Sequence, residues 1–99
     1  MITVKFDDQK VTDEKVTELS NALIGIVQKA TGIESVFVYA DSARIKIGVA
    51  PIEVFIEISA WKMADKDQLF EEIKTKLSDW KKEVGFDELI NLTLMPMEW

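Results

Sequence analysis

The stretch PIEVFIEIS, at residues 51–59, repeats the pattern with which the chain begins, MITVKFDD at residues 1–8. In both stretches apolar side chains alternate with other residues, and this period of two is typical of a strand with one face in a core. Placing Ile2 on Ile52 and Val4 on Val54 gives an offset of fifty residues. The sequence therefore predicts two copies of one strand, each of which opens one half of the chain.

Each predicted strand leads into an amphipathic helix. The first helix is expected over 13–31, because Thr12 is a good N-cap residue and Gly32 is well placed to end the helix. The second is expected to begin at 64–67 and to end at Gly85. In both helices apolar residues recur at spacings of three and four. The predicted inward stripes are Val16, Leu19, Leu23, Ile26 and Ala30 in the first helix, and Leu69, Ile73, Leu77, Trp80 and Val84 in the second.

Three further stretches read as strands. SVFVYA, at residues 35–40, follows the first helix and INLTLMPM, at 90–97, follows the second. Between the two halves, RIKIGV at 44–49 alternates again and is expected to form a short strand that Gly48 and Pro51 interrupt. The chain thus reads as a single domain of two β-α-β repeats, about 1–48 and 51–99.

The fold class that follows is α+β. Each helix must cover an apolar face of a sheet, so the simplest architecture is a four-stranded mixed sheet with two helices on one face. A ferredoxin-like sandwich has nearly the same order of elements and remains an alternative. The two folds differ in whether the first two strands are parallel neighbours.

The helix-free face of this sheet is expected to be an interface between subunits. It mixes aromatic and polar side chains and is more apolar than a monomer surface usually is. The carboxyl-terminal stretch LMPMEW, at 94–99, is also apolar where an unpacked tail would normally be polar. The residues assigned to this face are Thr3, Lys5, Phe37, Glu53, Phe55, Glu57, Asn91 and Thr93.

Composition excludes several classes of function. The 99 residues contain no cysteine and no histidine, which removes thiolate and imidazole chemistry together with the usual zinc ligands, so we expect no cofactor and no metal. The net charge is −6 and Arg44 is the single arginine, which opposes binding to nucleic acid. With no apolar stretch of membrane-spanning length and no leader pattern, we expect no membrane partner and a cytoplasmic location.

Three stretches together resemble the tautomerase superfamily, in particular a small bacterial branch related to macrophage migration inhibitory factor. They are ATGIESVFVYADS at 30–42, PIEVFIEISAW at 51–61 and VGFDELINLTLMPME at 84–98. The resemblance implies a tautomerase-like domain that forms a homotrimer, with the sheets of three subunits around a central channel. It also implies enol-keto chemistry by an amino-terminal proline exposed after removal of methionine.

That proline is missing from this sequence. Ile2 follows Met1, and so bulky a second residue is expected to retain the methionine and leave a primary amine. Pro51 cannot replace it, because its nitrogen lies in a peptide bond and has no basicity. Where the resemblance implies a pocket lysine after ATG, this chain has Ile33, and the strand that would supply a tyrosine has 89–92 instead.

The remaining candidates define two functional hypotheses. The first is an oligomeric module without proline-based catalysis that binds a protein or a small carboxylate or aromatic ligand; the second is a weak enol-keto tautomerase that uses the Met1 amine. Arg44 could anchor a carboxylate, but the favoured interpretation is a solvated arginine that pairs with Asp41. Glu53 and Glu57 could form an acid-base pair, but the favoured interpretation is two hydrated charges. The candidate ligand-binding residues are Ile2, Tyr39, Arg44 and Trp61, with Lys5 nearby. A proline in place of Ile2 is expected to fit, on the premise that the first strand position needs no ladder donor.

Overall fold

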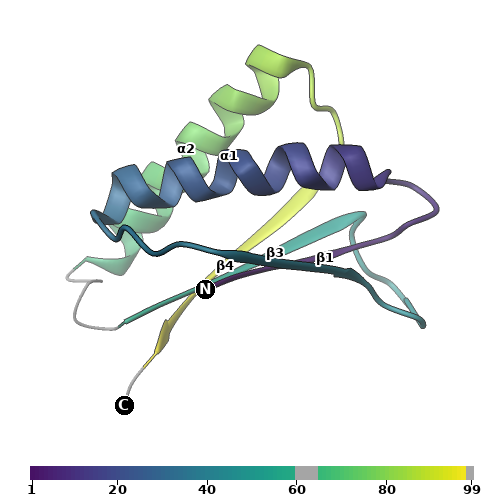
Figure 1. Cartoon of the computed structure of the whole chain (residues 1–99), viewed down its shortest axis with the longest axis horizontal. Coiled ribbons are helices and arrows are strands. Elements are labelled where there is room, and N and C mark those ends of the chain that lie inside the picture. Colours follow the sequence, from purple (N-terminus) through teal and green to yellow (C-terminus); the bar gives the residue numbers. More distant parts are fainter. Residues whose placement is uncertain (60–64, 98–99) are drawn as a thin grey trace.

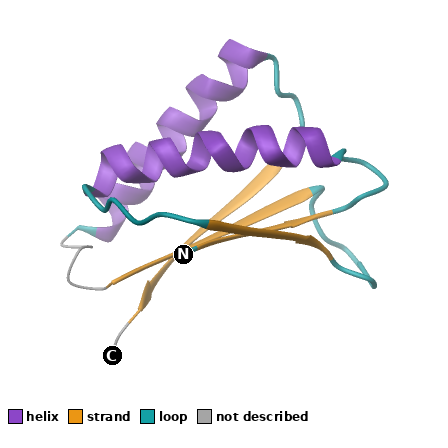
Figure 2. Ribbon diagram, in the orientation of Figure 1, coloured by secondary structure: helices purple, strands orange, loops and turns teal. Residues whose placement is uncertain are grey.

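Two helices cover one face of a four-stranded sheet and leave the other face bare (Figure 1). The computed structural model describes residues 1–59 and 65–97. Coloured by secondary structure, the helical layer and the strand layer separate clearly (Figure 2). The elements, in chain order, are β1 (Ile2–Phe6), α1 (Asp13–Thr31), β2 (Val38–Ser42), β3 (Ile52–Ser59), α2 (Lys66–Val84) and β4 (Ile90–Met97).

The sheet has the order β2-β1-β3-β4. β1 pairs in parallel with β2, from Ile2 opposite Val38 onward, and β3 pairs in parallel with β4. The two units join through β1 and β3, which are antiparallel with Val4 opposite Val54. Because the first two strands are parallel neighbours, the ferredoxin-like alternative is wrong and the predicted mixed sheet is confirmed.

Both helices have the ends that the sequence predicts. The Thr12 side chain accepts a hydrogen bond from the Lys15 amide at 3.3 Å, and Asp65 accepts one from the Gln68 amide at 3.0 Å. At the other end, Gly32 caps α1 in the left-handed region at φ 74°. Gly85 caps α2 in the same way, with φ 72°. These caps fix the helix lengths, and so determine where each chain segment returns to the sheet.

The core lies between the helices and the inner face of the sheet, and one of the predicted inward positions is wrong. The predicted Ile26 packs partly buried against the core, and Val27, which was not among the predicted positions, is buried at 2% exposure. Val84 is 45% exposed because it is the last residue of α2, where the helix has already passed the edge of the sheet. Both units contribute buried side chains to this core: the sheet contributes Ile2, Val4, Phe6, Ile52, Val54 and Ile56, and the helices contribute Val16, Leu19, Leu23, Ile73 and Leu77.

Two strand predictions also need correction. The second strand occupies Val38–Ser42 rather than 35–40, since β1 begins at Ile2 and offers no partner strand to most of the preceding residues. In the described structure residues 44–49 form no strand. Gly48 adopts a positive φ of 67°, and Lys46 is drawn to the carboxylates of the β1–α1 turn, so this segment forms a loop instead.

Candidate binding site on the outer sheet face

The outer face of the sheet carries the candidate site. We use this name for the side chains of the four strands that point away from the helices, which follow from the alternating burial and the strand register. All of them are half-buried or exposed. The outer face comprises Thr3 and Lys5 of β1, Tyr39 and Asp41 of β2, Glu53, Phe55 and Glu57 of β3, and Asn91, Thr93 and Met95 of β4.

The amino terminus is tied into the sheet. The Met1 amine donates a hydrogen bond to the Glu57 carbonyl at 2.8 Å, and the Glu57 amide donates one to the Met1 carbonyl at 2.8 Å. The side chain of Ile2 lies on the opposite face with no exposed surface, so it packs in the core. The Ile2 amide also donates to the Phe37 carbonyl at 3.0 Å, which corrects the premise that the first strand position needs no ladder donor.

The other candidate ligand-binding residues are dispersed. Tyr39 is exposed on β2, where its ring meets that of Phe37 edge-on with 5.8 Å between the centroids. Arg44 is exposed in the loop after β2. Trp61 lies outside the described residues. Tyr39 lies opposite Thr3, near the amino-terminal end of β1, whereas Arg44 follows the other end of β2, so the structure does not bring these two residues together.

Asp41 pairs with Lys5 rather than with Arg44. The Lys5 ammonium lies 2.8 Å from a carboxylate oxygen of Asp41, in line with the pairing of these two residues across β1 and β2. On its other side Lys5 faces Glu53 of β3. One ammonium thus stands between two carboxylates and bonds to the one on β2.

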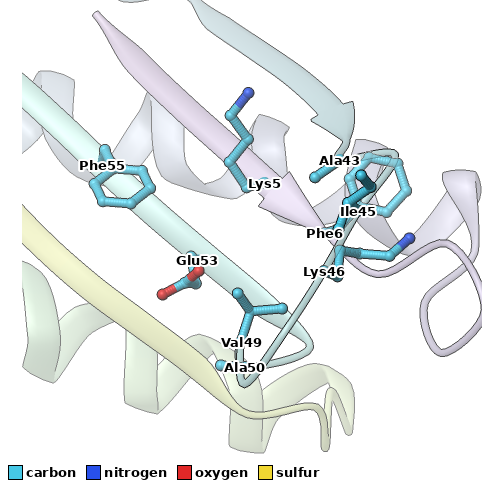
Figure 3. A pocket seen from close by; sticks show the side chains of 9 residues that line it. All are labelled: Lys5, Phe6, Ala43, Ile45, Lys46, Val49, Ala50, Glu53 and Phe55. Atoms are coloured by element: carbon cyan, nitrogen blue, oxygen red, sulfur yellow. The ribbon is translucent and has the colours of Figure 1, made fainter.

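A hollow of about 300 Å³ opens at the carboxyl end of β1, far along the strand from Met1 (Figure 3). It forms where the loop between β2 and β3 folds back beside the outer face. Its wall is mostly apolar, with one carboxylate and the stems of two lysines. The lining residues are Lys5, Phe6, Ala43, Ile45, Lys46, Val49, Ala50, Glu53 and Phe55.

An ion cluster holds this loop in place. The Lys46 ammonium lies 3.1 Å from Asp8 and 3.6 Å from Asp7, and the Ser42 hydroxyl donates to Asp8 at 3.3 Å. The hydrogen bond from Lys46 lowers the pKa of Asp8 below its ordinary value of 3.8. The same hydrogen bond raises the pKa of Lys46 above 10.5. Both groups therefore stay charged across the neutral range and fix the loop to the β1–α1 turn.

Apolar side chains on the same loop point into solvent. Ile45 is 77% exposed and Ile47 is 86% exposed, while Val49 lies at the rim of the hollow. Isolated exposed apolar residues are ordinary, but these three alternate along one segment, and Phe37 and Tyr39 are exposed at the other end of β2. Together with the outer face they form a continuous surface suited to contact with another molecule.

Sequence reasoning missed the hollow. The alternation of RIKIGV reads as a strand, and a strand there would leave no loop to enclose a space. Two features of the sequence pointed to a loop. Gly48 and Pro51 interrupt the alternation, and Asp7 and Asp8 are acidic residues that can pair with Lys46. Pairing these acidic residues with Lys46, which follows Asp8 by 38 residues, requires the three-dimensional structure.

Residues 1–59 and 65–97 carry neither a cluster of metal-ligand type nor a membrane-spanning helix. Within these ranges no group of three or more acidic side chains is placed to hold a metal ion. Neither described helix combines the length and the apolar character needed to cross a membrane.

No protein-family model and no curated protein matches the chain, whereas several solved structures match its fold. A fused 4-OT wild-type symmetric trimer has 18% identity and a TM-score of 0.66, over 97% of this chain and 84% of that one. Malonate semialdehyde decarboxylase has 12% identity and a TM-score of 0.67, over 99% and 84%. Native RhCC from Rhodococcus jostii RHA1 has 18% identity and a TM-score of 0.59, over 99% and 79%. With its order β2-β1-β3-β4 and both helices on one face, the chain has the fold of the tautomerase superfamily.

Proposed function

We propose that this protein is an oligomeric binding module that uses the tautomerase fold without proline-based catalysis. Its single domain would be built from two β-α-β repeats, β1-α1-β2 and β3-α2-β4. The observation that carries the proposal is the first residue: Ile2 follows Met1, so the terminal nitrogen is a primary amine, hydrogen-bonded to the Glu57 carbonyl, and the secondary amine of a terminal proline is missing. A general base needs its lone pair directed at a bound substrate.

The location of the hollow supports the same conclusion. It is lined by Lys5 and Phe6 at the end of β1, whereas the amine precedes the first residue of that strand, Ile2. A substrate held at the Lys5 and Glu53 end of the hollow would lie beyond hydrogen-bond reach of the amine, because Lys5 follows Met1 by four residues and a strand rises about 3.3 Å per residue. The space for a ligand and the amino-terminal nitrogen are therefore separated along β1.

The surface of the protein supports oligomerisation. The outer face and the loop at 43–50 together expose a broad region that is rich in apolar side chains. Solved neighbours of the same fold include symmetric and asymmetric trimers of fused 4-OT. We propose a homotrimer in which neighbouring subunits cover the exposed apolar side chains around the hollow and leave the hollow itself open. Ile47 of the loop would lie in the contact.

Light scattering coupled to size exclusion tests the assembly. We expect a mass of three times the 11.3 kDa of one chain, and a shift toward the monomer in Ile47→Ser. Val84→Ser is the matched control, because it also makes an exposed apolar residue polar, but at the end of α2. A mass of 11.3 kDa for the wild type at micromolar concentration would contradict the proposed assembly.

A further inference from the structure

The hollow beside β1 has the size and wall of a small-molecule site. Its volume of about 300 Å³ lies at the lower end of the range of roughly 300–1,000 Å³ for ligand pockets. Phe55 of β3 forms one side, and Val49 with Ala50 of the loop forms the other. Such a space accommodates a single aromatic ring with a short chain. The apolar wall selects ligands with an apolar body.

The two lysines that line the hollow direct their charges away from it. Both lysine ammoniums point away from it in Figure 3, Lys5 toward β2 and Lys46 toward the β1–α1 turn. Each is already paired, Lys5 with Asp41 at 2.8 Å and Lys46 with Asp8 at 3.1 Å. Their charges are therefore satisfied outside the cavity, and only their methylene stems contribute to its wall.

Glu53 is the acidic residue that lines the hollow. Its carboxylate lies between Phe55 and Val49 in Figure 3. Among residues 1–59 and 65–97, no cation comes within 4.0 Å of it, although Lys5 stands directly across the strand pair. The side chain is half-buried, so water screens it less than a fully exposed carboxylate. A ligand cation would find an unpaired anion beside an aromatic face.

We propose that this hollow binds a small ammonium ligand with an apolar body. The ammonium donates a hydrogen bond to Glu53, while the apolar body lies against Phe55 and Val49. A carboxylate of the same shape would face Glu53, and the two lysines that line the hollow are already paired with Asp41 and Asp8, so it is disfavoured. The net charge of −6 adds a field that attracts cations and repels anions.

This inference rests on the proposed binding role and gives it a ligand class. It is independent of the terminal amine, because the hollow lies at the other end of β1. It also departs from the carboxylate ligand expected from Arg44, whose side chain is not among those lining the hollow.

The probe is phenethylamine, titrated by calorimetry into the full chain, with 3-phenylpropionate as an anion of nearly the same shape. We expect saturable binding of the amine and none of the acid in the same concentration range. Glu53→Gln keeps the shape of the side chain but removes its charge, and we expect it to weaken amine binding roughly three- to tenfold, as for partly exposed ion pairs. Glu57→Gln is the matched control on the same strand face, and we expect a change below about twofold.

Three results would overturn the proposal: no saturable binding of phenethylamine up to low millimolar concentration, equal binding of 3-phenylpropionate, or equal weakening by Glu53→Gln and Glu57→Gln. The oligomer mass, measured on the same samples, separates this failure from failure of the proposed assembly. An intact trimer that does not bind the amine contradicts only the ammonium site. A monomer that binds it contradicts only the assembly.

Discussion

Met1 and Glu57 form a reciprocal pair of backbone hydrogen bonds, each 2.8 Å long, that extends the pairing of β1 with β3 by one residue. The terminal nitrogen is thereby used to continue the sheet. In a protein that worked through this nitrogen, the same position would have to leave the nitrogen open to a substrate. The pair connects the first residue of the chain to the strand that carries Glu53.

Ile2→Pro tests what this pair contributes. If the host removes Met1 before proline, the variant loses both hydrogen bonds to Glu57 and the fully buried Ile2 side chain, although a terminal proline can still donate to Phe37. We expect a folded protein whose free energy of unfolding is lower by about 2–4 kcal/mol. Ile2→Val is the control and should cost about 1 kcal/mol. Urea denaturation measures both, and an Ile2→Pro variant as stable as the wild type would show that the pair contributes nothing.

Replacing either of two glycines, one inside α1 and one at its end, by alanine should change the free energy of unfolding in opposite directions. Gly32 has a positive φ of 74°, so Gly32→Ala forces a side chain into the left-handed region and should cost about 1 kcal/mol. Gly25 lies inside the helix, and apart from the adjacent residues and the nearby helix backbone no atom lies within 4 Å of the position that an alanine methyl group would take, so Gly25→Ala should gain about 0.5–1 kcal/mol. Thermal unfolding of the two variants would disagree with this if both moved the midpoint in the same direction.

Val54 and Val84 offer the same substitution at a buried and an exposed site. Val54→Ala removes two methyl groups from a side chain with no exposed surface and should lower the free energy of unfolding by about 2 kcal/mol. Val84→Ala, at the end of α2, should change it by no more than about 0.5 kcal/mol. Equal losses in a denaturation series would mean that the sheet face is not the core.

The bond between Lys46 and Asp8 makes stability depend on pH. Because the folded pKa of Asp8 lies below 3.8, its contribution is present above 3.8 and disappears as the pH falls through the folded value. We therefore expect Asp8→Asn to be less stable than the wild type at neutral pH, with the difference closing in acid. Asp7 still faces Lys46 in the variant and limits the loss. Glu18→Gln, on the exposed face of α1, is the control; a difference for Asp8→Asn that persists unchanged in acid would contradict this account.

Much of the fold could be predicted from the sequence because its signals are local. The alternation of PIEVFIEIS and the caps at Thr12 and Gly32 each depend on a few neighbouring residues, and the structure confirms them. The error at 44–49 arose because strand formation also needs a partner strand. The ion pairs of Lys46 with Asp7 and Asp8 hold this segment as a loop.

The candidate site was harder to predict. Tyr39 and Arg44 are exposed as expected, and their role in ligand binding stays a prediction. Ile2 lies in the core, since a residue next to the chain terminus still follows the period of its strand. That Glu53 has no cation within 4.0 Å among residues 1–59 and 65–97 depends on which of two carboxylates Lys5 contacts, and only the geometry of the sheet decides that.

The most direct test of the central claim is the rate at which the wild-type protein converts the enol of phenylpyruvate to its keto form, before and after acetylation of the Met1 amine. The account predicts a rate at or near the uncatalysed background in both samples, because the terminal proline is missing and the Lys5 end of the hollow lies four residues beyond Met1. Robust turnover that acetylation abolishes would contradict it, and would establish the Met1 amine as the catalytic base.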